Sequence, residues 1–177
     1  MIIDFTYKDV KKYLPNKKID SNKYDSGQLL IIGGDENYPG AIILAAKMAV
    51  MSGVGLVYLY TKNQNVIKVL KEIPEIIVLD QKNRLNELLS YNIPVLAGPG
   101  TINNKWTIDT YGLMKNKPLT TILDAAFMEQ IKSTNSLKIK ILLPHEGEAA
   151  RLLNLPSSLI KKDRLNSAIK LSIKFNA

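Results

Sequence analysis

The side chains best suited to chemistry stand in a Pro-His-Glu-Gly-Glu corner at residues 144–148, between an apolar run and an amphipathic run. The corner contains His145, the only histidine of the chain, and Glu148. An imidazole at a strand-to-helix corner can hydrogen-bond a substrate, because backbone N–H groups converge there and the helix dipole favours anions. Acid–base catalysis by His145 would require an orienting partner that the sequence does not identify. We therefore predict a substrate contact at His145, against the simpler interpretation of a turn residue with Glu148 capping the next helix.

Three further corners follow apolar runs in the same way. They are Gly33–Gly40, Gly98–Gly100 and Asp124. Glycine permits sharp turns and lets a phosphate or sugar approach the backbone closely, although a glycine after a strand is most often only a turn. Asp124 could bind substrate hydroxyls or cap a helix over 127–131, and the sequence leaves both uses open. Because four such corners fall on one predicted rim, we expect a ligand site there.

The first corner leads into a helix that Pro39 can open, since a proline in the first helical turn loses no hydrogen bond. Ala41, Ala45 and Ala46 indicate close packing of this helix on the sheet. The same small residues leave its N-terminus accessible to a ligand, so both uses can hold.

The elements that must position these corners alternate between short apolar strands and helices. We expect strands at 29–32, 56–60, 75–79, 93–97, 121–124 and 138–143, and helices at 41–52, 65–71, 84–90, 106–115, 127–131, 147–153 and 162–174. The helix at 41–52 is so uniformly apolar that we expect it to be buried, and the polar lead-in at 4–23 predicts a short peripheral helix before Pro15. The alternation predicts an α/β fold: a three-layer αβα sandwich with a mostly parallel sheet and right-handed crossovers.

Composition limits the class of protein. A chain of 177 residues with 46% hydrophobic content predicts one globular domain. The net charge of +8 comes from scattered lysines with only three arginines, so we expect no nucleic-acid partner.

The absence of cysteine excludes disulfides and thiolate chemistry and fits a reducing compartment. The N-terminus lacks a signal-peptide pattern and the longest apolar segments are interrupted by Lys47, Gly53 and Gly55, which predicts a cytoplasmic protein without a membrane partner.

Two common nucleotide motifs are absent. Gly53-Val-Gly55 does not continue into a dinucleotide fingerprint, because the third glycine would fall on Tyr58 and the motif lies between a helix and a strand rather than the reverse. No Gly-x-x-x-x-Gly-Lys-Ser/Thr loop occurs either.

Six sequence blocks, taken in order, resemble the ADP/ATP-dependent NAD(P)H-hydrate dehydratases of the ribokinase-like superfamily. The blocks are Gly33–Ala41, Ser52–Val57, Pro74–Glu75, Gly98–Gly100, Leu123–Ala125 and Pro144–Leu153. The resemblance implies a repair reaction: a nucleotide phosphorylates the hydroxyl of hydrated NADH or NADPH (NADHX or NADPHX), and elimination of the phosphate restores the dihydropyridine.

The resemblance also implies that Ala41, the Gly98–Gly100 loop and His145 contact the hydrated dinucleotide. With the other rim residues, the predicted substrate-binding set is Tyr38, Gly40, Ala41, Gly98, Gly100, Asp124, His145 and Glu148. Mg²⁺ and ADP or ATP are the cofactors that the resemblance implies.

The catalytic Asp of the family belongs to a Gly-Ser-Gly-Asp corner that this sequence does not contain. Two smaller departures are Ala126 in place of an aspartate and Ile102 in place of a glycine. We therefore expect no catalytic residue and no metal ligand within 1–177, a single incomplete ribokinase-like domain that lacks the C-terminal part, and no unaided turnover.

Three functions remain open at this stage. The chain is a segment of a hydrate dehydratase, a non-catalytic dinucleotide-binding module, or a ribokinase-like kinase of small hydroxyl compounds. A homo-oligomer or a complementing C-terminal fragment is the expected macromolecular partner, because a sheet that ends early exposes an edge strand.

Overall fold

The computed structural model describes residues 5–14, 19–20, 22–131 and 137–177. Its strands are β1 (Gln28–Ile32), β2 (Leu56–Tyr60), β3 (Ile77–Leu79), β4 (Val95–Ala97), β5 (Thr120–Leu123) and β6 (Lys138–Leu142). They form a six-stranded sheet in the order β3-β2-β1-β4-β5-β6, and every pairing is parallel. Leu30, Ile31 and Ile32 of the central β1 are buried, as a strand covered on both faces requires. The predicted α/β class with a mostly parallel sheet is confirmed.

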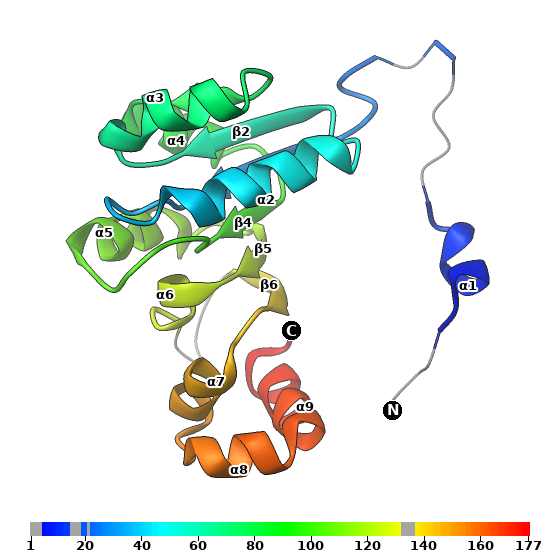
Figure 1. Cartoon of the computed structure of the whole chain (residues 1–177), viewed down its shortest axis with the longest axis vertical. Coiled ribbons are helices and arrows are strands. Elements are labelled where there is room, and N and C mark those ends of the chain that lie inside the picture. Colours follow the sequence, from blue (N-terminus) through cyan, green and yellow to red (C-terminus); the bar gives the residue numbers. More distant parts are fainter. Residues whose placement is uncertain (1–4, 15–18, 21, 132–136) are drawn as a thin grey trace.

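Helices cover both faces of the sheet. They are α1 (Tyr7–Lys11), α2 (Pro39–Met51), α3 (Asn63–Glu72), α4 (Lys82–Leu88), α5 (Lys105–Met114), α6 (Ala125–Met128), α7 (Glu146–Leu153), α8 (Ser157–Lys162) and α9 (Arg164–Phe175). One core joins α2 and α3 to one face of the sheet, through residues such as Ile42 and Val69. A second core joins α4, α5 and α6 to the other face, through residues such as Leu85, Met114 and Phe127. Figure 1 shows the resulting three layers.

The last three helices lie beyond the β6 edge of the sheet (Figure 1). They pack on one another through a third, smaller cluster made of Ala149, Ala150, Ile160 and Leu171. The predicted helix at 162–174 is present as α9, which begins two residues later at Arg164, whereas the short helix α8 that ends before Asp163 was not predicted. The side chain of Asp163 accepts a hydrogen bond from the Asn166 N–H at 3.1 Å and so caps α9.

Two expectations about helix burial are also corrected. The outward side of α2 exposes Leu44, Met48 and Met51, because the sheet covers only the side that carries Ile42, Ala46 and Ala49. Helix α1 buries none of its residues and stands apart from the sheet in Figure 1, so it does not pack as a peripheral helix.

Strand β6 forms one edge of the sheet and carries an irregularity. Thr121 pairs with Ile139 and Ile122 pairs with Ile141, which leaves Lys140 as an extra residue in the β6 strand. Lys138 and Lys140 are both exposed. A bulge and exposed lysines are two features by which proteins discourage other strands from adding to a sheet edge.

Candidate functional site

The four predicted corners lie side by side in the structure. They follow β1, β4, β5 and β6, which are consecutive neighbours in the parallel sheet, so their carboxyl ends share one edge. We call this edge the rim; it comprises residues 33–41, 98–101, 124–125 and 144–148. The convergence that the sequence predicted is therefore present.

The first two corners are joined through their backbones. The Gly34 N–H donates to the Pro99 carbonyl at 2.9 Å, and the Asp35 N–H donates to the Gly100 carbonyl at 2.7 Å. Gly100 has φ +68°, and a Cβ at this position would lie 2.3 Å from the Tyr38 carbonyl oxygen. Only glycine permits this close approach, so Gly100 is required by the packing of the two loops as well as by the turn.

Helix α2 starts directly at this junction. Tyr38 precedes its first turn and Pro39 occupies the start of the helix, as predicted. Ala46 is buried on the sheet, whereas Gly40 and Ala41 are exposed. The middle of α2 therefore packs on the sheet, while its N-terminus remains accessible.

The second and third corners also approach closely. Gly98 has φ +133°, and a Cβ there would lie 1.9 Å from the Asp124 carbonyl oxygen. The Asp124 N–H donates to the Ala97 carbonyl at 2.9 Å. Gly98 therefore sets the distance between the β4 and β5 corners.

Asp124 stands at the start of α6 but its side chain does not cap that helix. Burial raises the pKa of the Asp124 carboxyl and the nearby Glu148 carboxylate adds to the rise, against opposing effects of the Ala125 N–H and His145. The capping alternative for this side chain is wrong. A partly buried carboxylate with few stabilising partners remains available to a ligand.

His145 and Glu148 form a reciprocal capping arrangement at the start of α7. The His145 Nδ1 accepts hydrogen bonds from the N–H groups of Gly147 at 3.0 Å and Glu148 at 3.4 Å. The Glu148 carboxylate in turn accepts from the His145 N–H at 2.9 Å. The capping interpretation is confirmed, and it fixes the largely exposed imidazole with its Nε2 3.5 Å from a Glu148 oxygen.

The sequence interpretation overlooked Asp35, which is only 2% exposed. Its carboxylate accepts from Lys62 Nζ at 2.8 Å, from the Glu36 N–H at 2.7 Å and from the Asn104 side-chain amide. Burial opposes ionisation of Asp35, but these three donors outweigh it and hold the pKa below its ordinary value. A signal was present, because a carboxylate directly follows Gly33-Gly34 at the end of a buried strand.

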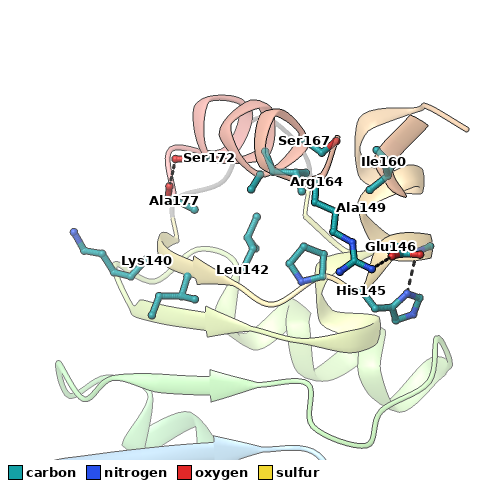
Figure 2. A pocket seen from close by; sticks show the side chains of 15 residues that line it. Lys140, Leu142, His145, Glu146, Ala149, Ile160, Arg164, Ser167, Ser172 and Ala177 are labelled. Atoms are coloured by element: carbon teal, nitrogen blue, oxygen red, sulfur yellow. Dashed lines mark hydrogen bonds and ion pairs between the residues drawn. The ribbon is translucent and has the colours of Figure 1, made fainter. Parts of the chain in front are cut away.

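A pocket of about 830 Å³ lies on the outer side of the last corner, between β6 and α9. Figure 2 shows Leu142, His145 and the ion pair between Glu146 and Arg164 around it. Gly98, Gly100 and Asp124 do not line this pocket. It shares Pro144, His145, Glu146 and Gly147 with the rim and does not reach the other three corners.

Neither a metal cluster nor a membrane span occurs in the described residues. Across 5–14, 19–20, 22–131 and 137–177, no group of three or more His, Asp or Glu side chains is arranged to hold a metal ion. Within the same part of the chain, no helix combines the length and apolar character needed to cross a bilayer.

Comparison with known proteins identifies the family. Residues 29–177 match the family model described as NAD(P)H-hydrate dehydratase. The chain belongs to the NAD(P)H-hydrate dehydratase family. It is 32% identical to the bifunctional NAD(P)H-hydrate repair enzyme Nnr of Escherichia coli, over 94% of this chain and 33% of that protein. It is 33% identical to the ADP-dependent (S)-NAD(P)H-hydrate dehydratase of Streptococcus pneumoniae, over 90% of this chain and 58% of that protein.

A solved structure has the same fold. The hypothetical protein SMU.573 of Streptococcus mutans superposes on 99% of this chain with a TM-score of 0.84 and 30% identity, and the match covers 64% of that protein. The predicted ribokinase-like fold of this family is thereby confirmed. The chain spans between one third and two thirds of the length of these three proteins.

Proposed function

We propose that this chain supplies the substrate-binding part of a dehydratase that returns hydrated NADH or NADPH to the reduced dinucleotide at the expense of ADP or ATP. The names of its relatives support the reaction class. We further propose that 1–177 behaves as one domain unit, because the six strands join a single sheet. The absence of cysteine supports a cytoplasmic location.

The observation that carries the proposal is the convergence of the four corners on consecutive strands. Gly98 and Gly100 bring backbone to positions that any Cβ would block, so the β4 corner packs directly on the backbone of Tyr38 and Asp124. Across these joined corners we propose that a planar ring or a sugar is held. The exposed start of α2 follows β1 at one end of this row of corners, and His145 follows β6 at the other.

The proposed roles follow from the position of each residue. Tyr38, Gly40 and Ala41 present the start of α2, whose N-terminal dipole favours a phosphate of the dinucleotide. Asp124 accepts a hydrogen bond from a substrate hydroxyl, and His145 donates one from Nε2–H, because its Nδ1 already accepts from the α7 backbone. Glu148 acts on the substrate only through His145, since it holds the backbone and imidazole of that residue.

The nucleotide, with Mg²⁺, would supply the phosphoryl group that turns the substrate hydroxyl into a leaving group. The contribution of the rim is to bind and orient the hydrated ring.

The test measures binding and turnover separately. Purified chain is titrated with NADPHX by calorimetry, and recovery of absorbance at 340 nm is followed after ADP or ATP and Mg²⁺ are added. Saturable binding that His145→Ala weakens supports the proposed site. Absence of binding to the folded chain at millimolar NADPHX would contradict it.

The turnover arm separates the remaining functions. Recovery at 340 nm shows a complete dehydratase, whereas binding without recovery supports a binding module or a partner that carries the catalytic corner. We propose a second copy of the chain or a complementing C-terminal fragment as that partner. Consumption of ATP with a sugar or pyrimidine alcohol, without binding of NADPHX, would favour the kinase alternative.

A further inference from the structure

Asp35 is the one buried carboxylate in the described part of the rim that accepts from three different residues. Its donors come from separate parts of the fold. Lys62 precedes α3, the Asn104 side chain lies at the start of α5, and the Glu36 N–H belongs to the loop itself. A buried charge that is hydrogen-bonded by separate elements fixes those elements relative to one another.

The backbone of Asp35 is engaged as fully as its side chain. Its N–H donates to Gly100, and its carbonyl accepts from the Asn65 side-chain amide at 3.0 Å. The same amide donates to the Gly34 carbonyl at 2.9 Å, and the Thr61 hydroxyl donates to that carbonyl at 3.0 Å. Gly34 and Asp35 are therefore held both by Thr61 and Asn65, at and before the start of α3, and by the Gly98–Gly100 loop.

Asn104 connects this cluster to a second helix. Its side-chain oxygen accepts from the Thr107 N–H at 3.1 Å and caps α5, while its amide nitrogen donates to Asp35. The two functions fix the orientation of the Asn104 amide, because a flip would replace an acceptor with a donor at one contact and a donor with an acceptor at the other. Asn104 thus cannot adapt to a change at Asp35 without loss of the cap.

We propose that Asp35 is a positioning residue: with Lys62 and Asn104 it holds the two glycine loops of the rim in the arrangement that binds the substrate. This inference rests on the proposed function for the identity of the ligand. Asp35 makes no direct substrate contact, since its carboxylate is buried and fully engaged. It acts through the position of Gly100 and of the start of α2.

The test variant is Asp35→Asn, which keeps the shape of the side chain. Its oxygen can still accept from Lys62 and from the Glu36 N–H, but its amide nitrogen meets the Asn104 amide donor. We expect backbone amide hydrogen exchange at Gly34 and at position 35 to accelerate at least tenfold. The Leu30 amide, which donates to the Pro94 carbonyl at the opposite end of β1 and β4, is the internal control and should be unchanged.

Binding provides the second measurement. We expect Asp35→Asn to weaken NADPHX binding by about tenfold or more, as the loss of a charge-assisted hydrogen bond predicts. The double variant Asp35→Asn, Asn104→Asp exchanges the donor and the acceptor and keeps an acceptor for the α5 cap. It should recover most of the affinity and of the exchange protection.

A matched control separates the Asp35 cluster from ordinary ion pairs. Lys47→Met breaks an exposed pair with Glu72 at 2.7 Å, whereas Lys62→Met breaks the buried pair with Asp35. Only Lys62→Met should loosen the rim amides. Equal acceleration of exchange at Gly34, position 35 and Leu30 in Asp35→Asn would overturn the inference, as would undiminished affinity in that variant. If the wild-type chain does not bind NADPHX, the proposed function fails, and the exchange data still decide whether Asp35 orders the rim.

Discussion

Two carboxylates mark two separate corners of the rim, and their surroundings differ sharply. Asp35, after β1, is almost completely buried, and three donors hold its pKa below the ordinary value. Asp124, after β5, is only partly buried and does not cap its helix, and burial with the nearby Glu148 carboxylate raises its pKa. Both residues follow parallel strands of the same sheet.

Position on the rim therefore does not determine what a carboxylate does. The number of hydrogen-bond donors already present decides whether it has capacity left for a ligand. Asp35 has its capacity filled by protein, which suits it to ordering the loops. Asp124 keeps unfilled hydrogen-bonding capacity, at some cost in stability.

The largest expected effect concerns Gly98, which lies between the two carboxylate corners. Gly98→Ala places a Cβ 1.9 Å from the Asp124 carbonyl and at φ +133°, so we expect a loss of about 3 to 4 kcal/mol in the free energy of unfolding. Gly40→Ala is the control, because a Cβ there meets nothing within 4 Å. It should leave stability within about 1 kcal/mol of wild type. Urea unfolding measures both, and similar losses would show that the glycine spacing is not what joins the corners.

The next effect tests the Asp35 corner directly. Asp35→Ala leaves the largely buried Lys62 without its main partner, so we expect a loss of about 2 to 3 kcal/mol at pH 7. Asp124→Ala should cost much less, since few interactions are lost.

The contribution of Asp35 to stability should depend on pH. Because the pKa of Asp35 is lowered on folding, this contribution is present above the unfolded-state value near 3.9 and is lost as the pH falls through the folded-state pKa. The stability gap between wild type and Asp35→Ala, measured by urea unfolding, should therefore narrow below about pH 4.

A smaller effect separates the cap from the ligand contact at His145. His145→Ala removes the acceptor for two N–H groups of α7 and should cost about 1 kcal/mol. Asn can accept at the same position, so His145→Asn should stay within about 0.5 kcal/mol of wild type in urea unfolding. Both variants should lose affinity for NADPHX in calorimetry. Retained affinity in His145→Asn would assign His145 to capping alone.

The smallest expected effect is a gain in stability, from a substitution at Asp124. Because the folded-state pKa of Asp124 is raised, its ionised form opposes folding, and Asp124→Asn should slightly raise the melting temperature at pH 7. The gain should shrink as the pH falls through the raised pKa, where wild-type Asp124 becomes protonated. Thermal melts between pH 4 and pH 7 measure this difference. A variant less stable than wild type at pH 7 would show that the Asp124 carboxylate is already well satisfied.

Much of the architecture could be predicted from local patterns. The apolar run around Ile31 and the Gly98-Pro-Gly100 stop indicated the positions of strands, because buried parallel strands leave an uninterrupted apolar signature. The short helix α8 was missed, since six residues carry too little of a helical period to be recognised in the sequence. The exposed side of α2 was missed as well, because a uniformly apolar helix carries no mark of which side faces the sheet.

Part of the candidate site could likewise be predicted from the sequence, and part could not. Glycines and His145 stand out by residue type, so the sequence could locate the corners. The role of Asp35 depends on Lys62 and Asn104, which are distant in the chain, and no local spacing reveals such a cluster. The Asp124 side chain could not be assigned from sequence, because whether it caps α6 depends on backbone angles at the corner.

The bulge at Lys140 has a consequence for selectivity between polypeptides. A strand that paired with the outer edge of β6 would have to follow a backbone kinked by one extra residue and would lie close to the exposed Lys138 and Lys140. A straight, uncharged strand fits poorly, whereas one with matching curvature and a carboxylate in register fits well. The bulge and the two lysines therefore disfavour pairing of β6 with a straight, uncharged strand.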